Sequence, residues 1–175
     1  MKKQKGFSLI ELLIVVAIIL IIAAIAIPNL MRSKMAANEA SAVGSIRTIN
    51  TAEVTYSSTW GTGFSANLAS LGGVASPCVA AAASACLIDG VLSTGVKSGY
   101  NFAAAGTLPS PTGGVLNGFE ANAWPAAFGT TGTRAFCSDQ SGVIRFNVAG
   151  AQIGLAAGTC ALVATAPGLS GPLGN

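Results

Sequence analysis

Histidine is absent from this chain of 175 residues, and charged residues make up only 9% of it. Without histidine, the chain lacks the base of Ser-His-Asp and Cys-His catalytic sites and a ligand of the commoner zinc sites. Its few carboxylates are scattered, with no spacing typical of metal ligands. The sequence therefore predicts that the protein is not an enzyme and that it has no cofactor and no metal site.

Positive charge is scarce outside the first residues. The formal net charge is +3, from nine Lys and Arg against six Asp and Glu. Lys2, Lys3 and Lys5 account for this excess, because the remaining six basic residues balance the six acids. Nucleic-acid-binding domains usually carry a basic patch, so we expect no specific nucleic acid as a partner. We interpret the three lysines as a topology signal that keeps the N-terminus in the cytoplasm.

Aromatic residues are also few, but the chain has one long apolar run. From Phe7 to Ile27, 21 residues are interrupted only by Ser8 and Glu11. As a helix, this run spans about 31 Å, which matches the hydrocarbon core of a bilayer. The length favours a membrane-spanning helix over a secretory signal peptide, whose apolar part has about 7–15 residues. Ala24-Ile25-Ala26 still fits a signal-peptidase site, so a secreted soluble enzyme is one alternative.

The start of the apolar run carries a family resemblance. Lys5-Gly6-Phe7-Ser8-Leu9-Ile10-Glu11-Leu12 resembles the processing signature of type IV prepilins and the related pseudopilins, and Pro28 matches their helix-kinking proline. The resemblance implies that a prepilin peptidase cuts between Gly6 and Phe7 and that the new amine of Phe7 is methylated. It also implies an α+β pilin fold, in which a long bent N-terminal helix packs on a small antiparallel β-sheet head domain.

Glu11 is the one acid in the apolar run. A carboxylate costs about 2.5–3.5 kcal/mol near the centre of a membrane helix and less near its end. In a bundle of cleaved subunits, the amine of Phe7 in a neighbouring copy can offset this cost, which would make Glu11 an assembly residue. A local alternative is a capping box formed by Ser8-x-x-Glu11, worth about 1 kcal/mol. The two roles do not exclude each other.

The resemblance and the composition divide the chain into four segments. These are a basic leader peptide at 1–6, a transmembrane and filament-core helix at 7–28, an amphipathic helix at 29–60, and an exported head domain at 61–175. Within the amphipathic helix, six residues recur at helical spacing and are predicted to be buried against the sheet. They are Ala36, Ala40, Val43, Ile46, Ile49 and Tyr56.

The head domain is predicted to contain a short helix and several strands. The helix is expected at Phe64–Leu71, capped by Ser65. Strands are expected at Leu87–Leu92, Gly99–Ala104, about Asn117–Ala123, Arg134–Ser138 and Val143–Val148. Their connections are too short for helical crossovers, so the sheet should be antiparallel. The stretch Ala164–Asn175 has few apolar anchors.

All four cysteines lie beyond the apolar run. An even number of cysteines in an exported region predicts two disulfides formed in an oxidising compartment. Four cysteines allow three connectivities, of which the pairing of sequence neighbours is the simplest. Free buried thiols are the alternative. The residues are Cys78, Cys86, Cys137 and Cys160.

The resemblance implies the major structural subunit of a type IV pilus, a homopolymer used for adhesion, surface attachment or twitching motility. Its partners would be other copies of itself, a prepilin peptidase and methylase, and an inner-membrane assembly platform with a cytoplasmic ATPase. The subunit would lie in the inner membrane as a single-pass protein before assembly and in the extracellular pilus afterwards. Alternatives are a pseudopilin of type II protein secretion and a minor tip pilin that binds DNA or a surface.

Overall fold

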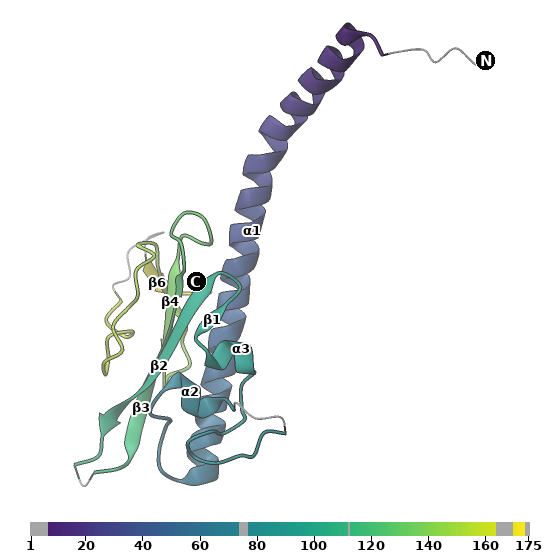
Figure 1. Cartoon of the computed structure of the whole chain (residues 1–175). Helices are drawn as coiled ribbons and strands as arrows, with labels where there is room; N and C mark the ends of the chain where they lie inside the picture. Colours follow the sequence, from purple (N-terminus) through teal and green to yellow (C-terminus); the bar gives the residue numbers. More distant parts are fainter. Residues whose placement is uncertain (1–6, 74–76, 112, 164–169, 174–175) are drawn as a thin grey trace. The chain divides into compact units, whose positions relative to one another are not determined.

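The structure of the chain is a computed structural model that describes residues 7–73, 77–111, 113–163 and 170–173. The chain divides into two compact units, Met1–Lys34 and Met35–Asn175. The first helix, α1 (Leu9–Trp60), contributes residues to both units (Figure 1). The predicted leader, with Gly6, lies outside the described residues.

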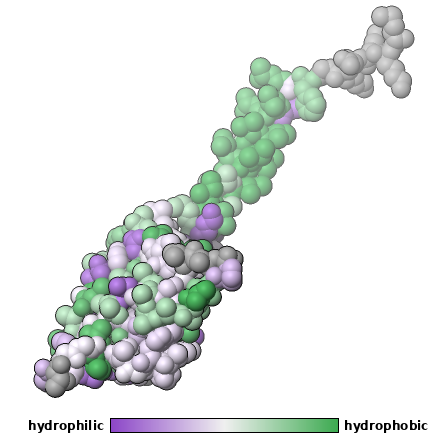
Figure 2. All heavy atoms as spheres, turned by 60° about the horizontal axis from the view of Figure 1, so that its bottom comes forward, coloured by the Kyte–Doolittle hydropathy of each residue, from purple (hydrophilic) through white to green (hydrophobic). Residues whose placement is uncertain are grey.

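From Leu9 to Ile27, α1 is apolar around its whole circumference except at Glu11. Every Leu, Ile and Val side chain from Leu9 to Ile27 is 46–78% exposed. The face shown in Figure 2 is correspondingly hydrophobic along this segment. The helical assignment continues through Pro28 without a break, so a bend at this residue stays a prediction. A helix that is apolar all round needs lipid or other protein to cover it.

The part of α1 in the second unit buries one stripe of side chains. The prediction of burial is confirmed for Ile46, Ile49 and Tyr56, but it is wrong for Ala36 and Ala40, which are exposed. The buried stripe instead lies on a neighbouring face of the helix that includes Glu39 and Glu53. It comprises Glu39, Ala42, Ser45, Ile46, Ile49, Ala52, Glu53 and Tyr56. The prediction failed because carboxylates were assumed to face water, whereas both glutamates have hydrogen-bond donors inside the unit.

The sheet is antiparallel throughout, as predicted, with the strands in the order of the sequence. Its long central hairpin pairs β2 with β3 from Tyr100 opposite Pro125 to Pro109 opposite Leu116. The strands are β1 (Val96–Lys97), β2 (Tyr100–Pro109), β3 (Leu116–Pro125), β4 (Ala135–Asp139), β5 (Arg145–Asn147) and β6 (Ser170–Pro172). The predicted hairpin between β4 and β5 is confirmed.

One face of the sheet packs on α1 and builds the core. Phe119 and Phe136, from β3 and β4, belong to the same buried cluster as Ile46 and Ile49 of the helix. Asn50 of the helix also donates a hydrogen bond to Ser138 Oγ of β4, at 2.8 Å. Residues that alternate with these on β3 and β4 therefore point to the opposite face, where the C-terminal segment lies (Figure 1).

Two predicted elements differ from those observed. The helix α2 is shorter than Phe64–Leu71, since it spans Leu68–Leu71 with Asn67 as its N-cap in place of Ser65. The predicted strand Leu87–Leu92 is wrong, because the helix α3 (Gly90–Ser93) occupies its end. Asp89 caps α3 by accepting a hydrogen bond from the backbone of Leu92 at 2.8 Å. A side-chain cap thus overrides a run of residues with strand propensity.

The C-terminal stretch is anchored more firmly than its composition indicates. Ser170–Pro172 forms β6, which pairs with β5 through Phe146 opposite Gly171. The backbone of Leu173 also donates a hydrogen bond to Ile144 O at 2.8 Å. The expectation of few anchors is therefore wrong for these residues, while residues 164–169 and 174–175 lie outside the described part.

Candidate functional site: the N-terminal segment and the contacts that hold the head domain

Glu11 lies in the first turn of α1 and caps it. The backbone N–H of Ser8 donates a hydrogen bond to Glu11 Oε2 at 2.9 Å, which is one half of the predicted capping box. A carboxylate has two oxygens and about four acceptor positions, so one such bond leaves most of its capacity unused. The capping role is therefore present in the single chain, and it leaves Glu11 able to accept a charged partner.

Phe7 precedes the helix, and its side chain is 88% exposed. Glu11 follows four residues later, about one helical turn further along the chain. Because Gly6 lies outside the described residues, the structure places only one side of the predicted cleavage bond. Cleavage between Gly6 and Phe7, methylation of Phe7 and pairing of Glu11 with another copy stay predictions.

The apolar surface around Glu11 has no cover within the first unit. Burying one large apolar side chain is worth about 1.5–3 kcal/mol, and α1 exposes such side chains at almost every position before Pro28. Within the described residues, α1 is the one helix long and apolar enough to span a membrane by length and composition. The segment is therefore suited to lipid or to a bundle of like helices.

In the second unit, Glu39 of α1 binds the loop between β3 and β4 through hydrogen bonds and an ion pair. Glu39 Oε1 accepts hydrogen bonds from the backbone N–H groups of Thr133 at 2.9 Å and Arg134 at 3.2 Å. Glu39 Oε2 lies 2.7 Å from Arg134 Nη2, forming an ion pair. The preceding residue, Asn38, donates a hydrogen bond to Thr131 O at 2.9 Å. Burial by itself would raise the pKa of Glu39, but the donors from Thr133 and Arg134 outweigh it and lower that pKa.

Glu53 of α1 binds a second loop, the one that contains Ser65, through hydrogen bonds alone and without a cation. Its carboxylate accepts hydrogen bonds from the backbone N–H of Ser65 at 2.8 Å and from the Ser65 hydroxyl at 2.7 Å. Glu53 is fully buried, and this burial raises its pKa above the usual value in spite of the two bonds. The residue predicted to cap α2, Ser65, is therefore used to pair with Glu53.

The sequence reasoning missed both glutamates as positioning residues. A signal was present in the sequence, since the buried positions of the helix follow one another at steps of three and four residues. The set is Glu39, Ala42, Ile46, Ile49, Glu53 and Tyr56. Glutamates that keep this step lie on the buried face and require donors there.

The structure contains both disulfides between sequence neighbours, Cys78–Cys86 and Cys137–Cys160. No described cysteine is free. Cys78–Cys86 closes a short loop after α2, whereas Cys137–Cys160 joins β4 to the C-terminal segment on the face of the sheet opposite α1. The two bonds thus act on different parts of the head domain.

Removing the second disulfide should destabilise the head domain more than removing the first. The separations are 23 and 8 residues, for which loop-closure entropy gives about 3.5 and about 2.6 kcal/mol. We expect the double variant Cys137→Ser/Cys160→Ser to unfold at lower urea concentration than Cys78→Ser/Cys86→Ser, with both below the parent chain. Tryptophan fluorescence of the full chain in detergent measures this order. The reverse order would mean that native contacts outweigh chain entropy.

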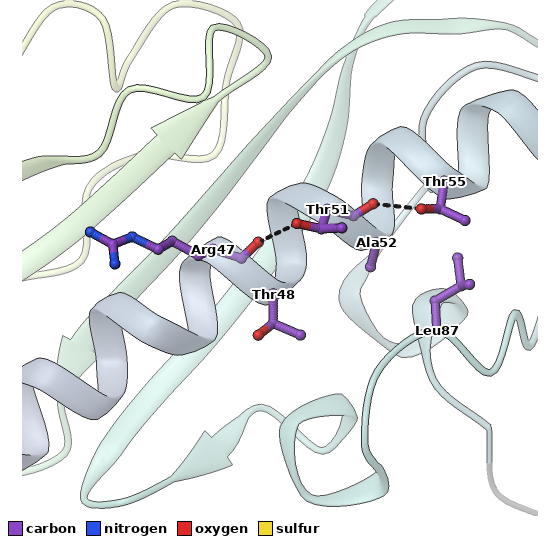
Figure 3. Close-up of a pocket in the computed structure, with 6 residues that line it drawn as sticks. All are labelled: Arg47, Thr48, Thr51, Ala52, Thr55 and Leu87. Atoms are coloured by element: carbon purple, nitrogen blue, oxygen red, sulfur yellow. Dashed lines mark hydrogen bonds between the residues drawn. The ribbon is translucent and has the colours of Figure 1, made fainter.

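The surface of the second unit has a shallow hollow on the outer side of α1. The hollow measures about 330 Å³ and is lined by five helix residues and Leu87 (Figure 3). Thr51 and Thr55 each donate their hydroxyl to a carbonyl one turn earlier, at 3.0 and 2.8 Å, so these groups are already used. No acid, cysteine or histidine lines it. Across the described ranges, no group of three or more His, Cys, Asp or Glu side chains is placed to hold a metal ion.

Comparison with known proteins finds a family match at the N-terminus and a partial match to one relative. Residues 1–27 match the family described as the prokaryotic N-terminal methylation motif. Over 39 residues, the chain is 59% identical to the type IV wide pilus major component PilA4 of Thermus thermophilus. That match covers 22% of this chain and 30% of the relative, so the chain spans less than a third of the relative's length. No solved structure matches the chain.

Proposed function

We propose that the chain is a type IV pilin-family protein and the major structural subunit of a type IV pilus, a surface filament for motility or adhesion. The observation that carries this proposal is an apolar helix segment, exposed on every side, with Glu11 as its one acid. In a bundle of such helices, the apolar side chains cover one another, and Glu11 finds a cation in the freed amine of a neighbour. The name of the PilA4 relative favours a major subunit over a scarce one.

Processing would prepare the chain for this packing. We propose that a prepilin peptidase cuts between Gly6 and Phe7 on the cytoplasmic side, and that the amine of Phe7 is then methylated. Before assembly, the apolar segment would span the inner membrane with the three leader lysines in the cytoplasm. An assembly platform with a cytoplasmic ATPase would then move each subunit from the membrane into the growing filament.

The head domain would form the outer surface of the filament and perform no catalysis. Its acids serve structure, since Glu39 and Glu53 hold loops and Asp89 caps α3. The hollow beside α1 offers hydroxyl groups that already donate to backbone carbonyls, without a neighbouring base. These arrangements suit a rigid subunit whose head domain stays folded during polymerisation.

Electron microscopy and mass spectrometry of filaments sheared from the cells test the proposal. We expect abundant surface filaments whose main protein begins at methylated Phe7, and we expect the filaments to disappear when the gene is deleted. Filaments that persist and contain the chain only in traces would indicate a tip subunit. A chain confined to the envelope, with protein secretion lost on deletion, would indicate a pseudopilin. A mature protein that begins after Ala26 would contradict the family processing altogether.

A further inference from the structure

The hollow on the outer side of α1 presents methyl groups in place of free hydroxyls. Hydroxyl groups are donated to backbone carbonyls four residues earlier by Thr48, Thr51 and Thr55, at 3.1, 3.0 and 2.8 Å. The methyl branch of each threonine is therefore left for contact with an occupant. Ala52 and Leu87 add further apolar surface (Figure 3). The hollow is thus suited to an apolar partner.

Arg47 lines the same hollow and brings a positive charge to it (Figure 3). It is exposed, and among the described residues no carboxylate forms an ion pair with it. The other described basic residues of the second unit are all ion-paired, namely Lys97 with Asp89, Arg134 with Glu39 and Arg145 with Asp139. An occupant of the hollow can therefore pair a carboxylate with Arg47.

Glu11 is the one described acid that is exposed and has no cation. Of the other five acids, three are ion-paired, and Glu53 and Glu120 are fully buried. Glu11 also lies in the segment Leu9–Ile27, whose Leu, Ile and Val side chains have no cover in the first unit. An uncovered apolar helix with one free acid complements a methyl-lined hollow with one free arginine.

The spacing of residues on the two helices permits this contact in a polymer. Identical subunits of an open helical filament all point the same way, so a helix of one copy runs parallel to that of another. Residues four apart lie on the same face of a helix. When Glu11 of one copy lies opposite Arg47 of another, Val15 faces Thr51. The next turn then reaches Thr55, at the far end of the hollow.

We propose that the hollow is the docking site for the apolar helix segment of a second copy, with Arg47 as a further cation for Glu11. The inference rests on the proposed function, because only a polymer brings the two helices together. Glu11 can accept both Arg47 and the amine of Phe7, since within the described chain only Ser8 donates to its carboxylate. Arginine suits this role because its planar guanidinium binds a carboxylate through two parallel hydrogen bonds.

Cells that produce Arg47→Glu in place of the parent chain test the charge. We expect at least about tenfold fewer sheared filaments, because two carboxylates then face each other across the contact. Arg47→Lys keeps the positive charge and should form filaments in nearly normal number. The control Gln140→Glu adds an exposed acid elsewhere on the head domain and should assemble like the parent. Urea unfolding checks that the variants are folded, and mass spectrometry checks that they are processed.

The double variant Val15→Cys/Thr51→Cys tests the contact directly. Mild oxidation of sheared filaments should link copies into a ladder on a non-reducing gel, and mass spectrometry should identify a disulfide between positions 15 and 51. The two native disulfides lie within one copy and produce no ladder. The matched control Val15→Cys/Val143→Cys uses an exposed valine that does not line the hollow, and it should give no mixed disulfide.

The outcomes separate this inference from the proposed function. Normal filaments from folded Arg47→Glu would overturn the inference and leave the proposed function standing. Filaments of the double variant without the disulfide between positions 15 and 51 would do the same, and lipid or another protein would then cover the hollow. Absence of filaments from cells with the parent chain would overturn the proposed function and this inference with it.

Discussion

Cells that produce Glu11→Gln in place of the parent chain are expected to insert and process the subunit but to lack filaments. Glutamine still accepts the hydrogen bond from Ser8, because its side-chain oxygen occupies the same position as Glu11 Oε2. It has no charge to pair with the amine of Phe7 in another copy. The variant thus keeps the capping role and removes the pairing role.

The comparison with Ser8→Ala and Glu11→Ala completes this test. Ser8→Ala leaves the Ser8 backbone donor and the charge of Glu11 in place, so filaments should form in normal number. Glu11→Ala removes both roles of the acid and should behave like Glu11→Gln. Sheared filaments are counted by electron microscopy, and processed subunit in the membrane is measured by mass spectrometry. Normal filaments in Glu11→Gln would show that Glu11 acts as a cap, whose worth is about 1 kcal/mol.

Glu39→Ala is expected to lower the free energy of unfolding of the head domain by about 2–3 kcal/mol. The substitution leaves the backbone donors of Thr133 and Arg134 without their acceptor on the helix. It also leaves the Arg134 guanidinium, which lies over the rings of Phe136 and Phe146, without its carboxylate. Urea unfolding followed by tryptophan fluorescence measures the change. The control is Asp89→Ala, which removes an exposed ion pair with Lys97 and the cap of α3 and should cost about 1 kcal/mol.

The pH dependence of stability separates Glu39 from Glu53. The pKa of Glu39 is lowered on folding, so its ionised form adds stability above the ordinary glutamate pKa, and this is lost as pH falls. The pKa of Glu53 is raised on folding, so its contribution is present at low pH and is lost as pH rises past the ordinary value. We therefore expect Glu39→Gln to flatten the acid side of the stability profile and Glu53→Gln to flatten the change toward neutral pH. Equal effects of both variants would contradict these directions.

The head domain shows where local sequence signals suffice and where they fail. The second strand of the central hairpin was predicted close to its observed position, whereas the first was predicted to end at Ala104 and in fact continues to Pro109. The segment around Asp89 was assigned to a strand, but the capping bond to Leu92 makes it a helix. Whether this segment forms a helix or a strand depends on one hydrogen bond between a side chain and the backbone, and strand propensity does not take such a bond into account.

The sequence by itself determined the N-terminal segment, since hydrophobicity, length and the acid at position 11 act locally and need no distant contact. It also determined the antiparallel sheet, because the connections are too short for any other pairing. Only the tertiary structure decided which cysteines join, which face of α1 is buried, and how the carboxylates of Glu39 and Glu53 find hydrogen-bond donors. Those outcomes depend on donors and acceptors up to about a hundred residues away, and a buried charge is stable only where folding brings its partner to it.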